Sequence, residues 1–300
     1  MDPAKYFAAS RVHIVAGKGG VGKTSVTAAA AVAAAQVGLK ALIVDIDGKF
    51  GAARLLGVDT LGYAVTPVDE RIDARHLAAD DSLLDYLADH GMGRIGRRLV
   101  TTGVLDVVAT AIPGIKDILV LGKIKQIERD AATNGTYDVI LVDAPAAGHA
   151  ITFLKAASGL LGAVAAGPIR QQAVDVAEML ADGNRCQVML VTLPEETPVN
   201  EASETAYALE ESVGVKLAPM VVNGVIAPMD GLDAATNNAT LLAAAKFRTE
   251  RMAEQHTHIE RLTKTLPLPH FELPFVFSAA LERDEIDTLA SAFLAGIAQL

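Results

Sequence analysis

Residues 17–24 constrain the chain most, because they read Gly-Lys-Gly-Gly-Val-Gly-Lys-Thr. This spacing matches the pattern G-x-x-x-x-G-K-[ST], in which the backbone N–H groups of a glycine-rich loop surround phosphate oxygens. The apolar residues 12–16 predict a buried strand before the loop, and the alanine-rich residues 25–37 predict a helix after it. A helix N-terminus attracts anions, so strand, loop and helix together predict a nucleotide phosphate site. The alternative is a glycine-rich turn without a ligand.

The loop residues have separate predicted roles. Lys23 is expected to reach the β- and γ-phosphates, and the Thr24 hydroxyl is expected to ligate Mg²⁺. Lys18, a second lysine in the loop, is either part of this site or a solvated surface side chain. The predicted nucleotide-binding residues in this region are Gly17, Lys18, Gly19, Gly20, Val21, Gly22, Lys23, Thr24 and Ser25.

Two further apolar runs end in carboxylates. Residues 41–44 lead into Asp45 and Asp47, and residues 139–142 lead into Asp143. The carboxyl ends of parallel strands face the ligand crevice of an open α/β sheet. Asp143 is therefore predicted to hold a Mg²⁺-bound water, since Mg²⁺ keeps several of its waters. Asp45 and Asp47 project similarly from their strand, and Asp47 could instead cap the next helix.

Composition narrows the functional class. A net charge of −10, 4% aromatic residues and no Trp argue against a nucleic-acid surface. The single cysteine, Cys186, cannot form an internal disulfide, which suits a reducing compartment. No apolar stretch is long enough to cross a bilayer, and residues 1–5 do not resemble a signal sequence. We therefore expect a cytoplasmic protein.

Alternating strand and helix patterns predict an α/β fold with a doubly wound, mostly parallel sheet and helical insertions. We expect one domain over residues 1–300, with insertions at about 52–136 and about 231–266. A short hairpin is expected within 63–76 and a further strand at 160–167. The apolar segment 99–121 is either buried against the sheet or a partner subunit, or lines a groove for an apolar client.

Residues 143–153 carry the most specific resemblance. They read D-A-P-A-A-G-H-A-I-T-F and are similar to the switch II sequence D-T-A-P-T-G-H-T-L-R-F of the arsenite-pump (ArsA) and guided-entry ATPases. The loop with Lys18 also resembles the deviant phosphate loop shared by MinD, ParA, the nitrogenase iron protein and ArsA. The resemblance to the ArsA and guided-entry family covers nearly the whole chain, and it implies a P-loop NTPase fold.

The resemblance implies a dimeric, Mg²⁺-dependent ATPase, either a homodimer or a heterodimer with a paralogous chain. Lys18 is then expected to reach the partner's nucleotide, Asp47 to orient the attacking water and His149 to sense the γ-phosphate. Asn223 and Pro274 match residues that contact the adenine in the family, although Asn223 could instead be a turn residue. The carboxylates within 194–201 either serve the dimer or cap a helix.

The chain departs from the family in three places. Gly48 and Lys49 stand where the family's switch I carries proline, which puts the rate of hydrolysis in question. No cysteine set for arsenite and no C-x-x-C pair for zinc is present, so we expect neither zinc nor arsenite activation. The protein or small-molecule cargo is left open, and a transient membrane-protein partner is one option. Two alternatives to a cycling ATPase are a targeting or chaperone factor for an apolar client and a weakly hydrolysing ATP-binding subunit of a hetero-oligomer.

Overall fold

The structure is a computed structural model, and it describes residues 1–89, 91, 114–232 and 238–300. The strands are β1 (Val12–Gly17), β2 (Ala41–Asp45), β3 (Thr66–Asp69), β4 (Ile72–His76), β5 (Val139–Ala146), β6 (Cys186–Thr192), β7 (Lys216–Leu217), β8 (Met220–Val225) and β9 (His270–Pro274). The helices are α1 (Pro3–Ala8), α2 (Lys23–Gln36), α3 (Gly51–Leu55), α4 (Ala79–Asp89), α7 (Ile115–Asn134), α8 (Ala147–Ala163), α9 (Pro168–Ala181), α10 (Glu196–Ser212), α11 (Ala239–Thr265) and α12 (Arg283–Gln299).

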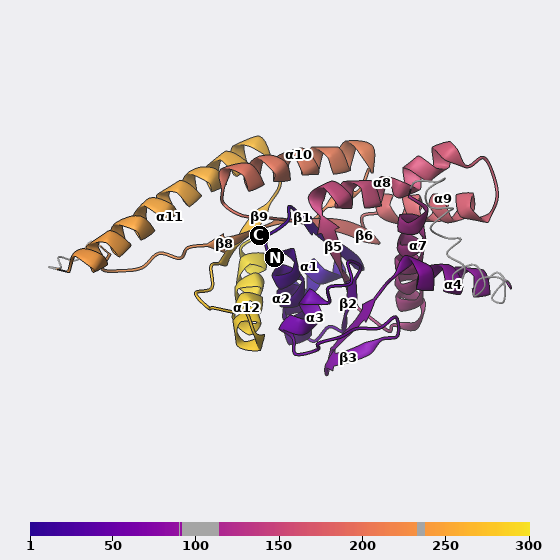
Figure 1. Ribbon diagram of the computed structural model, residues 1–300, viewed down its shortest axis with the longest axis horizontal. Helices are drawn as coiled ribbons and strands as arrows, with labels where there is room; N and C mark the ends of the chain where they lie inside the picture. Colours follow the sequence, from indigo (N-terminus) through magenta and orange to yellow (C-terminus); the bar gives the residue numbers. More distant parts are fainter. Residues whose placement is uncertain (90, 92–113, 233–237) are drawn as a thin grey trace.

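The strands form one sheet in the order β3-β4-β2-β5-β1-β6-β8-β9, with β7 beside β6 (Figure 1). All the pairings are parallel except the edge pair β3 and β4. The predicted doubly wound, mostly parallel sheet is therefore confirmed, and so is the predicted hairpin within 63–76. Because β1 lies between β5 and β6, the strand order reverses there, and ligands of such sheets bind outside the carboxyl ends at that point.

Each face of the sheet carries its own apolar core. Strand side chains alternate between the two cores, so Ile14 packs on the side of α7–α10 and Val15 packs on the side of α2 and α12. Buried alanines of α2 keep this helix close to the sheet, and Phe293 of α12 packs edge-on against Phe271 with the ring centres 4.8 Å apart. A strand covered on both faces reads as a continuous apolar run, which is why the central strands were predictable.

The strand predicted at 160–167 is wrong, because α8 continues to Ala163. Its buried side chains Ala150, Leu154, Ala157 and Leu160 recur every three or four residues, which is the helical period. A short run of Leu, Gly and Ala does not distinguish a buried strand from a buried helix. No strand therefore separates α8 from α9.

Part of the apolar segment 99–121 can be placed. Residues 99–113 lie outside the described residues, so the choice between core and client groove stays open there. From Ile115 onward the segment is α7, and Ile118 and Leu121 of that helix are fully buried. This last part of the segment, residues 115–121, belongs to the core.

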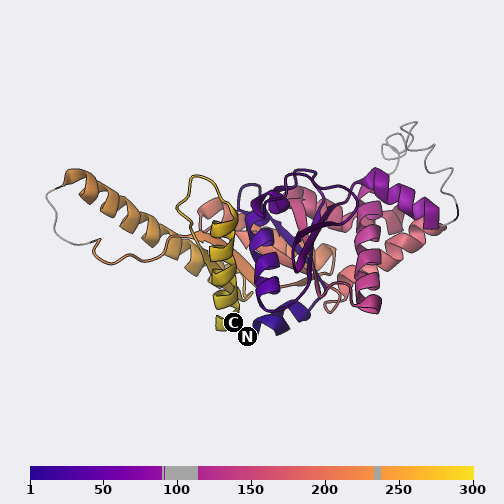
Figure 2. The same cartoon turned by 90° about the horizontal axis from the view of Figure 1, so that it is seen from below.

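Helix α11 extends away from the sheet at one end of the molecule, opposite α4, α7 and α9 (Figures 1 and 2). Gln255 and Leu262 are its only buried residues, whereas Leu241 and Phe247 are exposed. Gln255 fastens the helix to the sheet, because its amide donates to Gly224 O at 3.1 Å and accepts from the N–H of Ile226 at 2.9 Å. None of the described helices is both long and apolar enough to span a bilayer.

Candidate functional site

The predicted phosphate loop connects β1 to α2, at the position where the strand order reverses. Gly22 at the start of α2 has φ +89°, a left-handed conformation, and a Cβ there would lie 2.2 Å from the Asn223 amide nitrogen. A Cβ at Gly17 would lie 2.3 Å from the carbonyl oxygen of Val191. Glycine is thus required at both ends of the loop, since β6 and β8 approach its backbone so closely.

Lys23, Thr24 and Asp143 meet at the start of α2. The Lys23 ammonium donates to the backbone oxygen of Lys18 at 3.1 Å, and the Thr24 hydroxyl donates to Asp143 Oδ2 at 2.9 Å. Burial raises the pKa of Asp143 to about 6, and burial lowers the pKa of Lys23. The other carboxylate oxygen, Asp143 Oδ1, is buried and accepts no hydrogen bond from the residues that the structure describes.

These residues suit a magnesium ion held with nucleotide phosphates. Thr24 offers a hydroxyl oxygen, and the orphaned Asp143 Oδ1 can accept a hydrogen bond from a metal-bound water. Among the residues that the structure describes, no three or more His, Cys, Asp or Glu side chains gather as a metal cage. Mg²⁺ is usually bound by one or two protein groups plus phosphates and waters, and Thr24 and Asp143 supply two such groups.

Asp45 organises the loop that follows β2. Its carboxylate accepts the N–H groups of Gly48 at 2.9 Å and Phe50 at 3.1 Å, and His76 Nδ1 lies 2.8 Å from it. The residue is only 2% exposed, and burial raises its pKa. Asp45 is therefore committed to holding the loop. His76 has no sequence signal for this contact, because only the pairing of β4 with β2 brings it near.

Asp47, in contrast, lies exposed at the crevice. Its carboxylate accepts the backbone N–H of Lys49 at 3.0 Å and lies 3.0 Å from the Lys49 ammonium. Burial alone would raise the pKa of Asp47, but these two contacts with Lys49 lower it. Lys49, which belongs to the Gly48-Lys49 pair that stands where the family carries proline, therefore pairs with Asp47, the aspartate that the resemblance assigns to the attacking water.

Lys18 does not point at the Thr24–Asp143 pair of its own chain. Its ammonium lies 2.6 Å from Glu201 Oε1 on α10, and both side chains are 38% exposed. The sequence left two roles open for the carboxylates within 194–201, in the dimer or as a helix cap, and in the structure one of them, Glu201, pairs with Lys18. This contact joins residues 183 positions apart, so local sequence could not reveal it.

The two residues expected at the adenine lie at neighbouring strand ends. The Asn223 amide donates to Val21 O of the phosphate loop at 2.9 Å, and Val225 of β8 pairs with Pro274 of β9. Asn223 Oδ1 makes no hydrogen bond within the described residues, so it is available to accept one. His149, at the start of α8, is exposed.

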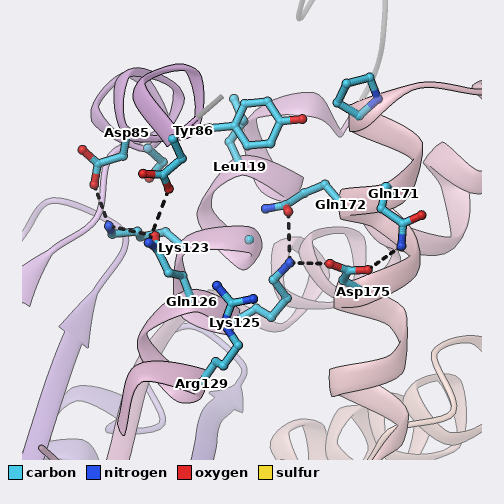
Figure 3. A pocket seen from close by; sticks show the side chains of 14 residues that line it. Asp85, Tyr86, Leu119, Lys123, Lys125, Gln126, Arg129, Gln171, Gln172 and Asp175 are labelled. Carbon is cyan, nitrogen blue, oxygen red and sulfur yellow. Dashed lines mark hydrogen bonds and ion pairs between the residues drawn. The ribbon is translucent and has the colours of Figure 1, made fainter. Parts of the chain in front are cut away.

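A cavity of about 410 Å³ lies between α4, α7 and α9, and charged side chains that pair with one another line it (Figure 3). Lys123 pairs with Asp85 at 2.6 Å, and Lys125 pairs with Asp175 at 2.8 Å and with Gln172 at 3.1 Å. These contacts fasten α7 to α4 on one side and to α9 on the other. Their polar groups are occupied with one another, which indicates a structural role.

The chain is similar to several ATPases. A family model described as "Anion-transporting ATPase" matches residues 10–165. The chain is 30% identical over 298 residues to the ATPase BagA of Mycobacterium tuberculosis, an alignment that covers 89% of this chain and 87% of BagA. It is 28% identical over 255 residues to an arsenical pump-driving ATPase of Escherichia coli, covering 79% of this chain and 42% of that protein. It is 24% identical over 269 residues to the ATPase GET3B of Arabidopsis thaliana, covering 73% and 65%.

Proposed function

The chain belongs to the anion-transporting (ArsA-like) ATPase family, and on that premise we propose that it is a Mg²⁺-dependent ATPase whose active sites are completed across a dimer. The observation that carries the proposal is the Thr24–Asp143 pair, with an orphaned carboxylate oxygen, beside Lys23. We further propose that residues 1–300 act as one ATPase domain, whose cycle of conformations drives a partner or cargo.

Lys23 and Thr24 bind the nucleotide in this proposal. The Lys23 ammonium, which rests on the Lys18 carbonyl, moves to the β- and γ-phosphates, and the backbone N–H groups of residues 17–24 surround them. Thr24 would hold Mg²⁺ directly and Asp143 would hold it through water, and when bound the ion would supply charge that neutralises the phosphates. Asn223 Oδ1 accepts a hydrogen bond from the adenine amino group, and Pro274 contacts the adenine ring.

Asp47 orients the attacking water. Its lowered pKa keeps the carboxylate ionised at neutral pH, so it can accept a hydrogen bond from that water. Phosphoryl transfer needs mainly positioning and charge stabilisation, so a strong general base is not required. His149 responds to the γ-phosphate as part of the second switch.

Lys18 acts on the nucleotide of the partner subunit. In the single chain its ammonium is held by Glu201 on α10, away from its own Thr24 and Asp143. A cation placed against the transferring phosphoryl group stabilises charge in the transition state, and arginine fingers in trans accelerate related reactions by about 10³–10⁵. Dimer formation therefore includes breaking the Lys18–Glu201 pair.

The partner that the cycle drives is proposed to be a protein rather than a soft-metal anion. Related proteins are named as arsenical pump-driving ATPases, but Cys186 is buried and its pKa is raised to about 12 by that burial. A thiol of this kind stays protonated and does not offer a thiolate ligand. A pull-down with and without a non-hydrolysable ATP analogue would identify the partner.

A second candidate function is that of a weakly hydrolysing subunit of a hetero-oligomer. The observation that favours it is the Lys49 ammonium on the carboxylate of Asp47, which competes with the attacking water for the same oxygen. Turnover measured for the isolated chain and again with its captured partner separates the two functions.

The decisive experiment for the proposed function is replacement of Lys23. Lys23→Ala should abolish ATP turnover and Mg²⁺-dependent nucleotide binding, because it removes the charge that meets the β- and γ-phosphates. Lys5→Ala, at an exposed position on α1, is the matched control and should behave as the wild type. Unchanged hydrolysis in the Lys23→Ala protein would show that the loop is not the catalytic site.

A further inference from the structure

A cavity of about 460 Å³ lies beside the proposed active site, between the loop after β2 and the first turns of α7 and α8. Asp47 and Gly48 line one wall, His149 and Phe153 line another, and Val120 of α7 belongs to a third. Ligand pockets in proteins usually measure about 300–1,000 Å³. A space large enough for a small organic molecule therefore touches the two switch segments, the loop with Asp47 and the start of α8 with His149.

Much of the lining is apolar and packed into the core. Leu77, Val120 and Phe153 are 1%, 7% and 5% exposed, and all three belong to the core on the α7–α10 side of the sheet. These walls are supported from behind by packed side chains, so they offer a preformed surface. An apolar group that enters the cavity leaves water, which favours binding.

One acid in the cavity lacks a donor. Among the described residues, Asp117 makes no hydrogen bond and no ion pair, although it is half-buried. Burial raises its pKa, and the neighbouring His149 acts in the opposite direction. The other carboxylates nearby are occupied, since Asp47 pairs with Lys49 and Asp45 with His76. Asp117 lines the cavity and has no donor of its own among the described residues, so it is the position where a ligand's donor would be recognised.

We propose that this cavity binds a small amphiphilic amine, with its ammonium group on the Asp117 carboxylate and its apolar body against Val120 and Phe153. The same ligand regulates hydrolysis, and this second part rests on the proposed ATPase function. Because Asp47 and His149 both line the cavity, a bound amine has different contacts in the ATP and ADP states. Nucleotide and amine then change each other's affinity by the same factor.

The first test is binding of 4-phenylbutylamine to the nucleotide-free protein, measured by ligand-detected NMR titration. A ligand of this size is expected to bind with a Kd of about one millimolar. Its matched anion, 4-phenylbutyrate, and its matched alcohol, 4-phenylbutan-1-ol, should each bind at least fivefold more weakly. Equal or tighter binding of the anion would overturn the assignment of the ligand's charge and with it the proposal.

Variants locate the binding. Asp117→Asn should weaken the amine about tenfold, because a charge-assisted hydrogen bond is lost without a change of shape. Asp130→Asn, at an exposed position of the same helix, should bind as the wild type. Ala78→Leu, which fills the cavity and keeps Asp117, should also prevent binding. If amine affinity is the same in Asp117→Asn and Ala78→Leu as in the wild type, the cavity is not the site.

The second test separates this proposal from the ATPase assignment. The affinity for the amine should differ at least fivefold between protein saturated with ADP and protein saturated with a non-hydrolysable ATP analogue, a coupling of ordinary size. A protein that hydrolyses ATP but binds the amine equally in both states would overturn the regulatory part alone. A protein that binds the amine through Asp117 but neither binds nor hydrolyses ATP would overturn the proposed function and leave the amine site standing.

Discussion

Asp143 should destabilise the protein whenever metal and nucleotide are absent. Its carboxylate is 7% exposed, one oxygen accepts only the Thr24 hydroxyl, and the other accepts nothing. Burial raises its pKa from the ordinary 3.8 to about 6. The folded chain therefore holds an ionised group, at neutral pH, in surroundings that favour the neutral form. Replacing Asp143 by Asn removes that charge and keeps an oxygen for Thr24.

The size of the effect follows from linkage. The folded pKa is about 6 and the unfolded value is near 3.8, so ionised Asp143 lowers the free energy of unfolding by about 3 kcal/mol above pH 6. This cost is lost as the pH falls from about 6 to below about 3.8, where the carboxyl becomes protonated in both states. The new amide leaves its buried NH2 group without an acceptor, which costs about 1–2 kcal/mol. The net gain for Asp143→Asn at pH 7.5 is about 1–2 kcal/mol, or about 2–4 °C in Tm.

The assay is thermal unfolding in EDTA without nucleotide, followed by circular dichroism at pH 7.5 and pH 5. Asp143→Asn should melt above the wild type at pH 7.5, and the difference should shrink at pH 5. Asp45→Asn is the matched control at the paired position of the neighbouring strand, and it should lower Tm because three donors face that carboxylate. A lower or equal Tm for Asp143→Asn at pH 7.5, or a difference that ignores pH, would refute the reasoning.

Three further predictions concern the dimer and the first switch. Lys18→Ala and Asp47→Asn homodimers should both be nearly inactive, and reassembled mixed dimers should recover turnover; verified mixed dimers without activity would exclude a role for Lys18 in trans. Glu201→Gln should strengthen nucleotide-dependent dimerisation about fivefold in sedimentation velocity, because each half-exposed pair is worth at most about 1 kcal/mol and two are broken per dimer. Weaker association would mean that Glu201 serves the interface. Lys49→Ala should raise kcat severalfold and move the acidic limb of the pH–kcat profile to higher pH. The two contacts with Lys49 lower the pKa of Asp47, and the substitution removes one of them, the ammonium pair. An unchanged pH–kcat profile would contradict this.

The sequence predicted the parts of the fold that depend on local pattern. The central strands are continuous apolar runs, and the loop from Gly17 to Thr24 has the spacing of the phosphate-loop pattern between a strand and a helix, so both could be placed. The strand expected at 160–167 was wrong because Ala, Gly and Leu fit a buried helix equally well. The contacts of His76 with Asp45 and of Glu201 with Lys18 could not be predicted, since each depends on elements that only the folded sheet brings together.

The site residues divide in the same way. Motif spacing identified Lys23, Thr24 and Asp143, and the structure brings the hydroxyl and the carboxylate within hydrogen-bond distance. Spacing alone left Asp45 and Asp47 as equal candidates, because residues two apart point to the same side of a strand. The backbone N–H groups of Gly48 and Phe50 distinguish them, and such donors are invisible in a sequence.

A tilt of helix α11 near Gln255 would displace its far end more than the residues beside the sheet. Its first buried residue is Gln255, which is bonded to the backbone at the end of β8, one residue beyond Asn223. Residues 239–255 span about 24 Å at about 1.5 Å per residue, so a tilt of about 10° about Gln255 moves the far end by about 4 Å. In such a tilt the pivot, Gln255, lies beside the proposed adenine contact of Asn223, and the end that moves most is the exposed part near Leu241 and Leu242. A spin label near Leu241 would detect this displacement on adenine binding, although the label itself lies far from the nucleotide.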